Sequence, residues 1–156
     1  MAIDFTYDRT VDLALFTLTG PFDLEEWLRS AKTDRFTPAL LEIVDMRRCN
    51  LNAMRSMDLF KFTRYLQSAI AAGRLIPGKT AILAGEEGPL IYNPAYRVFH
   101  NFFIFARENN LPRAYKLFAS VREALAWLEM PPLPHPLAHA LGLGCPDHGA
   151  GYDMPN

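Results

Sequence analysis

Three charged residues directly follow an apolar segment of the sequence. Asp45, Arg47 and Arg48 come after residues 40–44, which read LLEIV. We expect this run to form a buried strand, and in open α/β sheets ligands bind just beyond the carboxyl ends of the strands. Asp45 could bind the polar group of a ligand or pair with Arg47 or Arg48, and the two arginines could bind an anion together with the start of the next helix. The alternative is structural, with Asp45 accepting hydrogen bonds from loop amides and the arginines solvated.

Aromatic side chains recur at four-residue steps further along the chain. Tyr92, Tyr96 and His100 share one face of a segment with helical periodicity, and Arg97 lies beside them. Aromatic bulk combined with polar groups suits a pocket or an interface. An aromatic stripe can equally be core, since helices bury such faces by default. The face expected in the core comprises Phe99, Phe102, Phe103 and Ala106. Phe105 lies off that face, and its exposure would favour a homodimer.

Potential metal ligands and nucleophiles are few. His135, His139, Cys145 and His148 fall within fourteen positions, and imidazole and thiolate bind zinc. Their spacing is wider than in usual zinc motifs, and the surrounding prolines and glycines favour flexibility, so we predict no metal site. Cys49 lies beside two arginines, which would lower the pKa of a reactive thiol, but an idle thiol is more common.

Signatures of enzymes are missing from the sequence. It has no phosphate-binding glycine loop, no nucleophile elbow and no HExxH motif. We therefore predict a non-enzymatic protein without a cofactor.

The composition limits the function classes further. The 156 residues carry 16 basic and 17 acidic side chains, a balance that does not favour nucleic acid as a partner. No apolar run reaches the ~18 residues of a membrane span. The first residues lack the basic and apolar regions of a secretory signal, and two distant cysteines do not indicate a disulfide scaffold, so we expect a cytoplasmic protein.

Hydrophobic periodicity predicts the elements that would position these residues. Strands at 3–7 and 11–19 form an antiparallel hairpin, and a helix begins at the Asp23–Glu26 capping box. The strand at 40–44 precedes a polar loop at 47–50 and a long helix from Asn52 that ends at Gly73. A strand at 80–84, a helix at 92–109, a strand at 113–119 and a helix after Ser120 follow. This alternation predicts an α/β fold with a five-stranded, mostly parallel sheet and four helices.

The C-terminal segment differs in composition. Residues 130–156 are rich in proline and glycine, and proline excludes a helix at 131–136. We predict a single domain at 1–129 and an extended or partly disordered tail at 130–156. Leu133, Leu137, Leu141 and Leu143 would let part of the tail pack on the domain or on a second subunit.

The order of the expected elements resembles the STAS domains, the anti-sigma-factor-antagonist fold, and most closely their small stand-alone SpoIIAA-like group. The resemblance covers residues 3–129. It rests on the hairpin that ends at Gly20 and on four segments: VDMR at 44–47, KTAIL at 79–83, YRVF at 96–99 and VREALAWL at 121–128. It implies a βα superhelix. In antagonists of this family an Asp-Ser-Ser/Thr-Gly motif is phosphorylated at the start of the helix after the third strand. Here residues 53–56 read AMRS, which lacks the aspartate and the glycine and offers only Ser56.

The resemblance implies a regulatory or ligand-binding module of bacterial signalling. We expect a protein partner or small ligand to bind the rim between the strand at 40–44 and the following helix, at Asp45, Arg47, Arg48 and Ser56. The neighbouring wall would comprise Tyr92, Tyr96 and Arg97. The second hypothesis is carriage of an apolar, lipid-like molecule in a pocket lined by the aromatic helix.

Overall fold

The computed structural model describes residues 1–33, 36–52, 54–74, 76–84 and 96–143, which form one sheet covered by helices. The strands are β1 (Ala2–Asp8), β2 (Leu13–Pro21), β3 (Leu41–Asn50), β4 (Gly78–Leu83) and β5 (Arg113–Phe118). The helices are α1 (Leu24–Ala31), α2 (Ser56–Ala71), α3 (Tyr96–Glu108), α4 (Val121–Trp127) and α5 (His135–Ala140). The predicted α/β fold with a five-stranded mixed sheet is confirmed.

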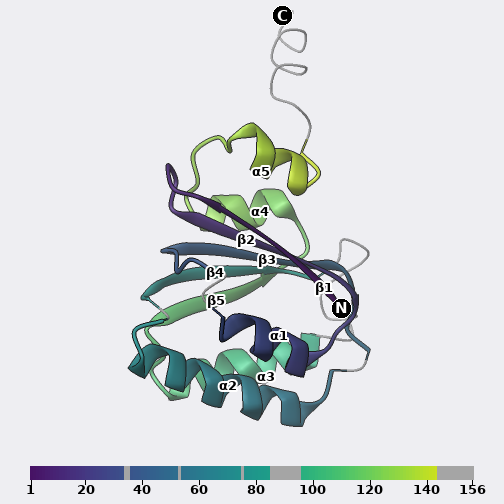
Figure 1. The fold of residues 1–156 in the computed structure, drawn as a ribbon, viewed down its shortest axis with the longest axis vertical. Coiled ribbons are helices and arrows are strands. Elements are labelled where there is room, and N and C mark those ends of the chain that lie inside the picture. The colour runs from purple at the N-terminus through teal and green to yellow at the C-terminus, as the bar shows by residue number, and fades with distance from the viewer. Residues whose placement is uncertain (34–35, 53, 75, 85–95, 144–156) are drawn as a thin grey trace, which may run out of the picture.

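The spatial order of the strands follows their order in the chain. β1 pairs with β2 as an antiparallel hairpin, and β2 to β5 are mutually parallel. Crossovers between parallel strands are right-handed as a rule, and here each one steps to the next strand in the same direction. The three crossover helices must therefore lie on the same face of the sheet. Figure 1 shows α1, α2 and α3 on one face and α4 and α5 on the other.

Each face of the sheet has its own apolar core. In β2, Leu13 and Leu15 face α4 and α5, whereas Ala14, Phe16 and Leu18 face the other helices. This division follows from the two-residue repeat of a strand. A strand that is apolar on both alternations, as predicted for residues 11–19, is buried on both sides and becomes a central strand.

The predicted helix ends are confirmed at three places. The Asp23 carboxylate accepts a hydrogen bond from the Glu26 amide at 3.1 Å, and the Ser120 hydroxyl accepts one from the Glu123 amide at 3.4 Å. Gly73 follows α2 with a φ of 69°, a conformation that glycine adopts without strain.

The third strand is longer than the sequence predicts. Residues 47–50, expected as a polar loop, continue β3, with Arg48 opposite Thr19 and Asn50 opposite Pro21. The pairing shifts register here, because β2 advances two residues from Thr17 to Thr19 while β3 advances three from Asp45 to Arg48. The extra residue is a bulge in β3, beyond which the two strands pair again. The following helix begins at Ser56 rather than near Asn52.

A fifth helix corrects the prediction for the C-terminal segment. Residues 135–140 form α5, and Pro136 fits because proline is tolerated in the first turn of a helix. Leu137 and Leu141 are buried on the face covered by α4, and Leu133 and Leu143 are partly buried there. This part of the tail thus packs on the domain, one of the two arrangements expected from its leucines. Residues 144–156 lie outside the described residues.

Candidate functional site

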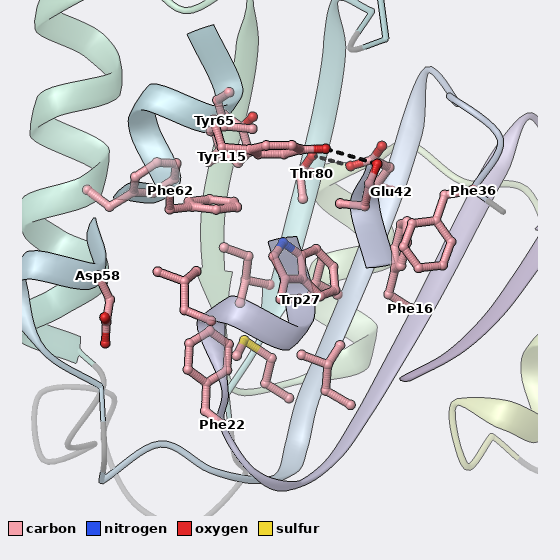
Figure 2. Close-up of a pocket in the computed structure, with 18 of the residues that line it drawn as sticks. Phe16, Phe22, Trp27, Phe36, Glu42, Asp58, Phe62, Tyr65, Thr80 and Tyr115 are labelled. Carbon is pink, nitrogen blue, oxygen red and sulfur yellow. Dashed lines mark hydrogen bonds between the residues drawn. The ribbon is translucent and has the colours of Figure 1, made fainter. Parts of the chain in front are cut away.

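A cavity of about 460 Å³ lies between the sheet and the helices α1, α2 and α3. Its wall is almost entirely apolar and aromatic, and Figure 2 shows its principal side chains. An apolar cavity of ~150 Å³ suffices to hold benzene, and pockets for larger small molecules span ~300–1,000 Å³. The cavity thus has the size and lining of a site for a small apolar molecule. Its apolar wall includes Phe16, Leu18, Phe22, Trp27, Phe36, Val44, Met46, Phe62, Ile82, Phe99 and Phe102.

The lengths of the covering helices explain why this face is incompletely filled. At 1.5 Å per residue, α1 with 8 residues spans ~12 Å, whereas α2 with 16 residues spans ~24 Å. The short α1 therefore covers only part of the sheet beside α2. The small residues Ala14 and Thr80 on the same face fill little of the remaining space.

One wall of the cavity is a cluster of aromatic rings. Phe16 on β2 contacts Trp27 on α1 edge-on, with ring centroids 5.4 Å apart, and Phe36 lies 5.0 Å from Phe16. Across the cavity, Phe62 on α2 packs on Phe102 on α3 at 5.4 Å. Ring pairs at these distances stabilise one another beyond the burial of their area. These packed rings therefore define the shape of the cavity wall.

The other end of the cavity is polar, and the strand register explains why. Glu42 on β3 lies opposite Thr80 on β4, and Thr80 lies opposite Tyr115 on β5. Opposite residues of neighbouring strands point to the same face, so the three side chains form a row across the sheet. All three line the cavity, and Figure 2 shows them gathered at one end of it.

A buried arginine, Arg113, contacts two members of this row, Glu42 and Thr80. The Thr80 hydroxyl donates to Glu42 Oε2 at 3.0 Å and accepts from Arg113 Nε at 2.6 Å, and the guanidinium of Arg113 lies 3.5 Å from Glu42 Oε2. The side chain of Arg113 is fully buried. Its terminal nitrogens donate to four backbone carbonyls, those of Ala39, Leu40, Ile76 and Lys79. Arg113 thus ties the starts of β3, β4 and β5 together, and its donors are committed within the protein.

Burial sets the proton affinity of Glu42. Removal from water raises the pKa of this carboxyl above its ordinary value, and the charge of Arg113 and the Thr80 hydrogen bond offset the rise only in part. The side chain keeps 15% of its surface exposed, which matches a position on the cavity wall. The protonated form of Glu42 is therefore more favourable in the folded protein than in water.

The Tyr115 hydroxyl is the polar group without a partner in this row. It is buried and makes no hydrogen bond of acceptable geometry with the described residues. Burial raises the pKa of Tyr115 well above its ordinary value, and the neighbouring Glu42 carboxylate adds to the rise. The phenol therefore stays protonated and remains a hydrogen-bond donor.

Two of the residues predicted for the rim bind each other instead of facing the cavity. The Arg47 guanidinium contacts the Asp45 carboxylate at 2.8 and 2.9 Å and also donates to the Leu141 carbonyl at 3.0 Å. Asp45 also accepts from the Arg47 amide at 3.1 Å. Both side chains lie on the face covered by α4 and α5. Asp45 thus pairs with Arg47 and also accepts a backbone amide, whereas Arg48 is exposed.

The remaining predicted residues lie elsewhere. Tyr96 begins α3, packs beside the core on the cavity face and stacks on His100 at 5.8 Å, while Arg97 is exposed. Ser56 is the first residue of α2, and Tyr92 lies outside the described residues. The structure thus brings Asp45 and Arg47 together but places them on the opposite face of the sheet from Tyr96.

The site prediction missed the cavity residues Glu42 and Tyr115 and the buried Arg113 that binds Glu42. One signal was available, because Glu42 is the single charge inside the apolar run at 40–44. A charged residue in a buried strand must find partners, and it often marks a functional position.

Two of the four potential zinc ligands, His135 and His139, lie within the described residues. His135 and His139 stack along α5 at 6.1 Å, and Cys145 and His148 lie outside the described residues. No group of three or more metal-ligating side chains occurs in the part of the chain that the structure describes.

Burial raises the pKa of the Cys49 thiol, which does not favour a reactive thiolate. Within the same described ranges, no helix combines the length and the apolar character of a membrane span.

Comparison with known proteins assigns this chain to no family. No protein-family model matches this chain, and no curated protein matches it.

Proposed function

We propose that the protein is a binding module that holds one small apolar molecule between the sheet and the helices α1 to α3. The observation that carries this proposal is the apolar cavity of about 460 Å³ with aromatic walls. Burying an apolar ligand releases ~25 cal/mol for each Å² removed from water, so such a site favours lipid-like molecules. This is the second of the two functions expected from the sequence, with walls supplied mainly by β2, β3, α1 and α2 and by part of α3.

Native mass spectrometry of freshly purified protein tests the proposal. We expect an additional mass that organic extraction removes, and uptake of an apolar fluorescent probe by the extracted protein. Val44→Phe places a larger side chain on the cavity floor and should weaken binding at least about tenfold, because a single methylene can change pocket affinity by that factor. Ala126→Phe is the matched control, since Ala126 is exposed on α4. Unchanged probe binding by the Val44 variant would contradict the proposal, as would a wild-type protein that takes up no probe.

A regulatory role of the same module in the bacterial cytoplasm rests on the resemblance to STAS domains. Arg48 at the end of β3 and Arg97 in the first turn of α3 are exposed and free to meet a protein partner. A pull-down from the native host should lose its specific partner with Arg48→Glu and keep it with Arg122→Glu, an exposed arginine on α4. Equal recovery by the two variants would count against a partner at Arg48.

A further inference from the structure

The polar end of the cavity indicates which apolar molecules the protein selects. We infer that the ligand carries one neutral oxygen, as in an alcohol, ketone, ester or amide, and that this oxygen accepts a hydrogen bond from the Tyr115 hydroxyl. The inference rests on the proposed binding function and adds the chemical class of the ligand.

The unpartnered donor is the first observation. Tyr115 lines the cavity, and its hydroxyl is buried without a hydrogen-bond partner among the described residues. Buried polar groups are nearly always paired, so an unpaired donor in a cavity wall indicates an acceptor that arrives with a ligand. The ring is held in place by Phe102, which packs edge-on with centroids 5.0 Å apart. This packing places the Tyr115 ring at the cavity wall.

Tyr65, the other tyrosine in the cavity lining, differs from Tyr115 because its hydroxyl has a hydrogen-bond partner. Tyr65 on α2 also lines the cavity, but its hydroxyl donates to the Ala31 carbonyl at 3.3 Å. Both tyrosines thus line the same cavity, and only Tyr65 has its hydroxyl bonded within the described part of the protein.

The charges at this end favour a neutral group over a carboxylate. Glu42 lies in the same row as Tyr115, two strands away, and two carboxyl groups in one apolar site cannot both be ionised without cost. Arg113 cannot compensate for a second anion, because its nitrogens already bind Thr80, Glu42 and four backbone carbonyls. An alcohol could in addition donate to the Glu42 carboxylate. Fatty-acid anions are therefore expected to bind more weakly than alcohols or ketones of equal length.

A matched series of eight-carbon probes tests the inference. Octane, octanol, methyl hexyl ketone and octanoate are compared by displacement of a bound apolar fluorophore, in the wild type, Tyr115→Phe and Tyr7→Phe. The wild type should bind octanol and the ketone about three- to tenfold more tightly than octane, the range of one net hydrogen bond. Tyr115→Phe should lose this preference. Tyr7→Phe should keep it, because Tyr7 lies outside the cavity lining and its hydroxyl donates to Asp12 at 2.9 Å.

The outcomes separate this inference from the function on which it rests. A wild type that binds octane and octanol equally, or octanoate as tightly as octanol near neutral pH, would overturn the inference and leave the proposed function standing. Retention of the preference by Tyr115→Phe would also overturn it. If none of the four probes binds, the proposed function itself is wrong. Because the comparison within the wild type needs no variant, the result does not depend on the folding of Tyr115→Phe.

Discussion

Arg113→Met should destabilise the protein in a strongly pH-dependent way. The substitution keeps an unbranched side chain but removes the cation that lies 3.5 Å from Glu42 and the donors to four backbone carbonyls. Breaking a buried ion pair by removing one partner costs about 3–5 kcal/mol, because the other charge is left buried and uncompensated. A domain of this size has a total stability of about 5–15 kcal/mol, so the variant should still fold.

The pH dependence follows from the proton affinity of Glu42. Its pKa is already above the ordinary value of 4.5 in the folded protein, and Arg113 is the charge that holds it down. A carboxyl with a higher pKa in the folded than in the unfolded state binds more protons when folded. The free energy of unfolding therefore falls as pH rises from the unfolded-state pKa to the folded-state pKa. Removing Arg113 raises the folded-state pKa of Glu42 and so extends this pH range upwards. Each tenfold increase in the proton affinity of Glu42 adds about 1.4 kcal/mol to the loss.

Urea unfolding monitored by tryptophan fluorescence measures this difference, since Trp27 and Trp127 report on opposite faces of the sheet. The cost of Arg113→Met at about pH 8 should exceed the cost at about pH 5 by at least ~1.4 kcal/mol. Arg113→Met combined with Glu42→Gln removes the titrating group and should show an equal cost at both values. An equal cost in the single variant would refute the assigned coupling between Glu42 and Arg113.

Three further predictions test the structural interpretation. Gly78→Ala should cost about 3 kcal/mol of stability, because a Cβ there would lie 1.9 Å from the Leu40 carbonyl oxygen. Gly73→Ala has open space around it and should cost only about 1 kcal/mol, for its positive φ. Equal losses of the two variants in urea unfolding would contradict this. Arg47→Met should cost about 3 kcal/mol and increase amide exchange in α5, since Arg47 joins buried Asp45 to the Leu141 carbonyl; unchanged exchange would show that this contact does not hold the helix. Asp23→Ala removes the N-cap of α1 and should cost about 1 kcal/mol, a fall of about 2–4 °C in Tm, and an unchanged Tm would argue against the cap.

The sequence predicted the layers of this fold because local periodicity and connection rules determine them. The strands alternate with helices, and right-handed crossovers leave few arrangements for four parallel strands. Two elements were wrong because their causes are not local. Residues 47–50 are a strand only because the end of β2, from Thr19 to Pro21, pairs with them beyond the bulge in β3. Residues 135–140 are a helix because Leu137 and Leu141 find an apolar surface beside α4, and this tertiary contact outweighs the prolines around them.

The binding cavity could not be predicted in the same way, because a cavity is space that side chains do not fill. Its existence depends on the mismatch between the short α1 and the long α2, which becomes visible only when the helices are placed on the sheet. Its chemistry was nevertheless encoded in three strands, as Glu42, Thr80 and Tyr115 each occupy an inward position of their strand. Placing them in one row requires the register, which no single segment carries. An acid in an otherwise apolar strand is therefore the part of such a site that a sequence can show, since its burial requires partners such as Arg113 from another strand.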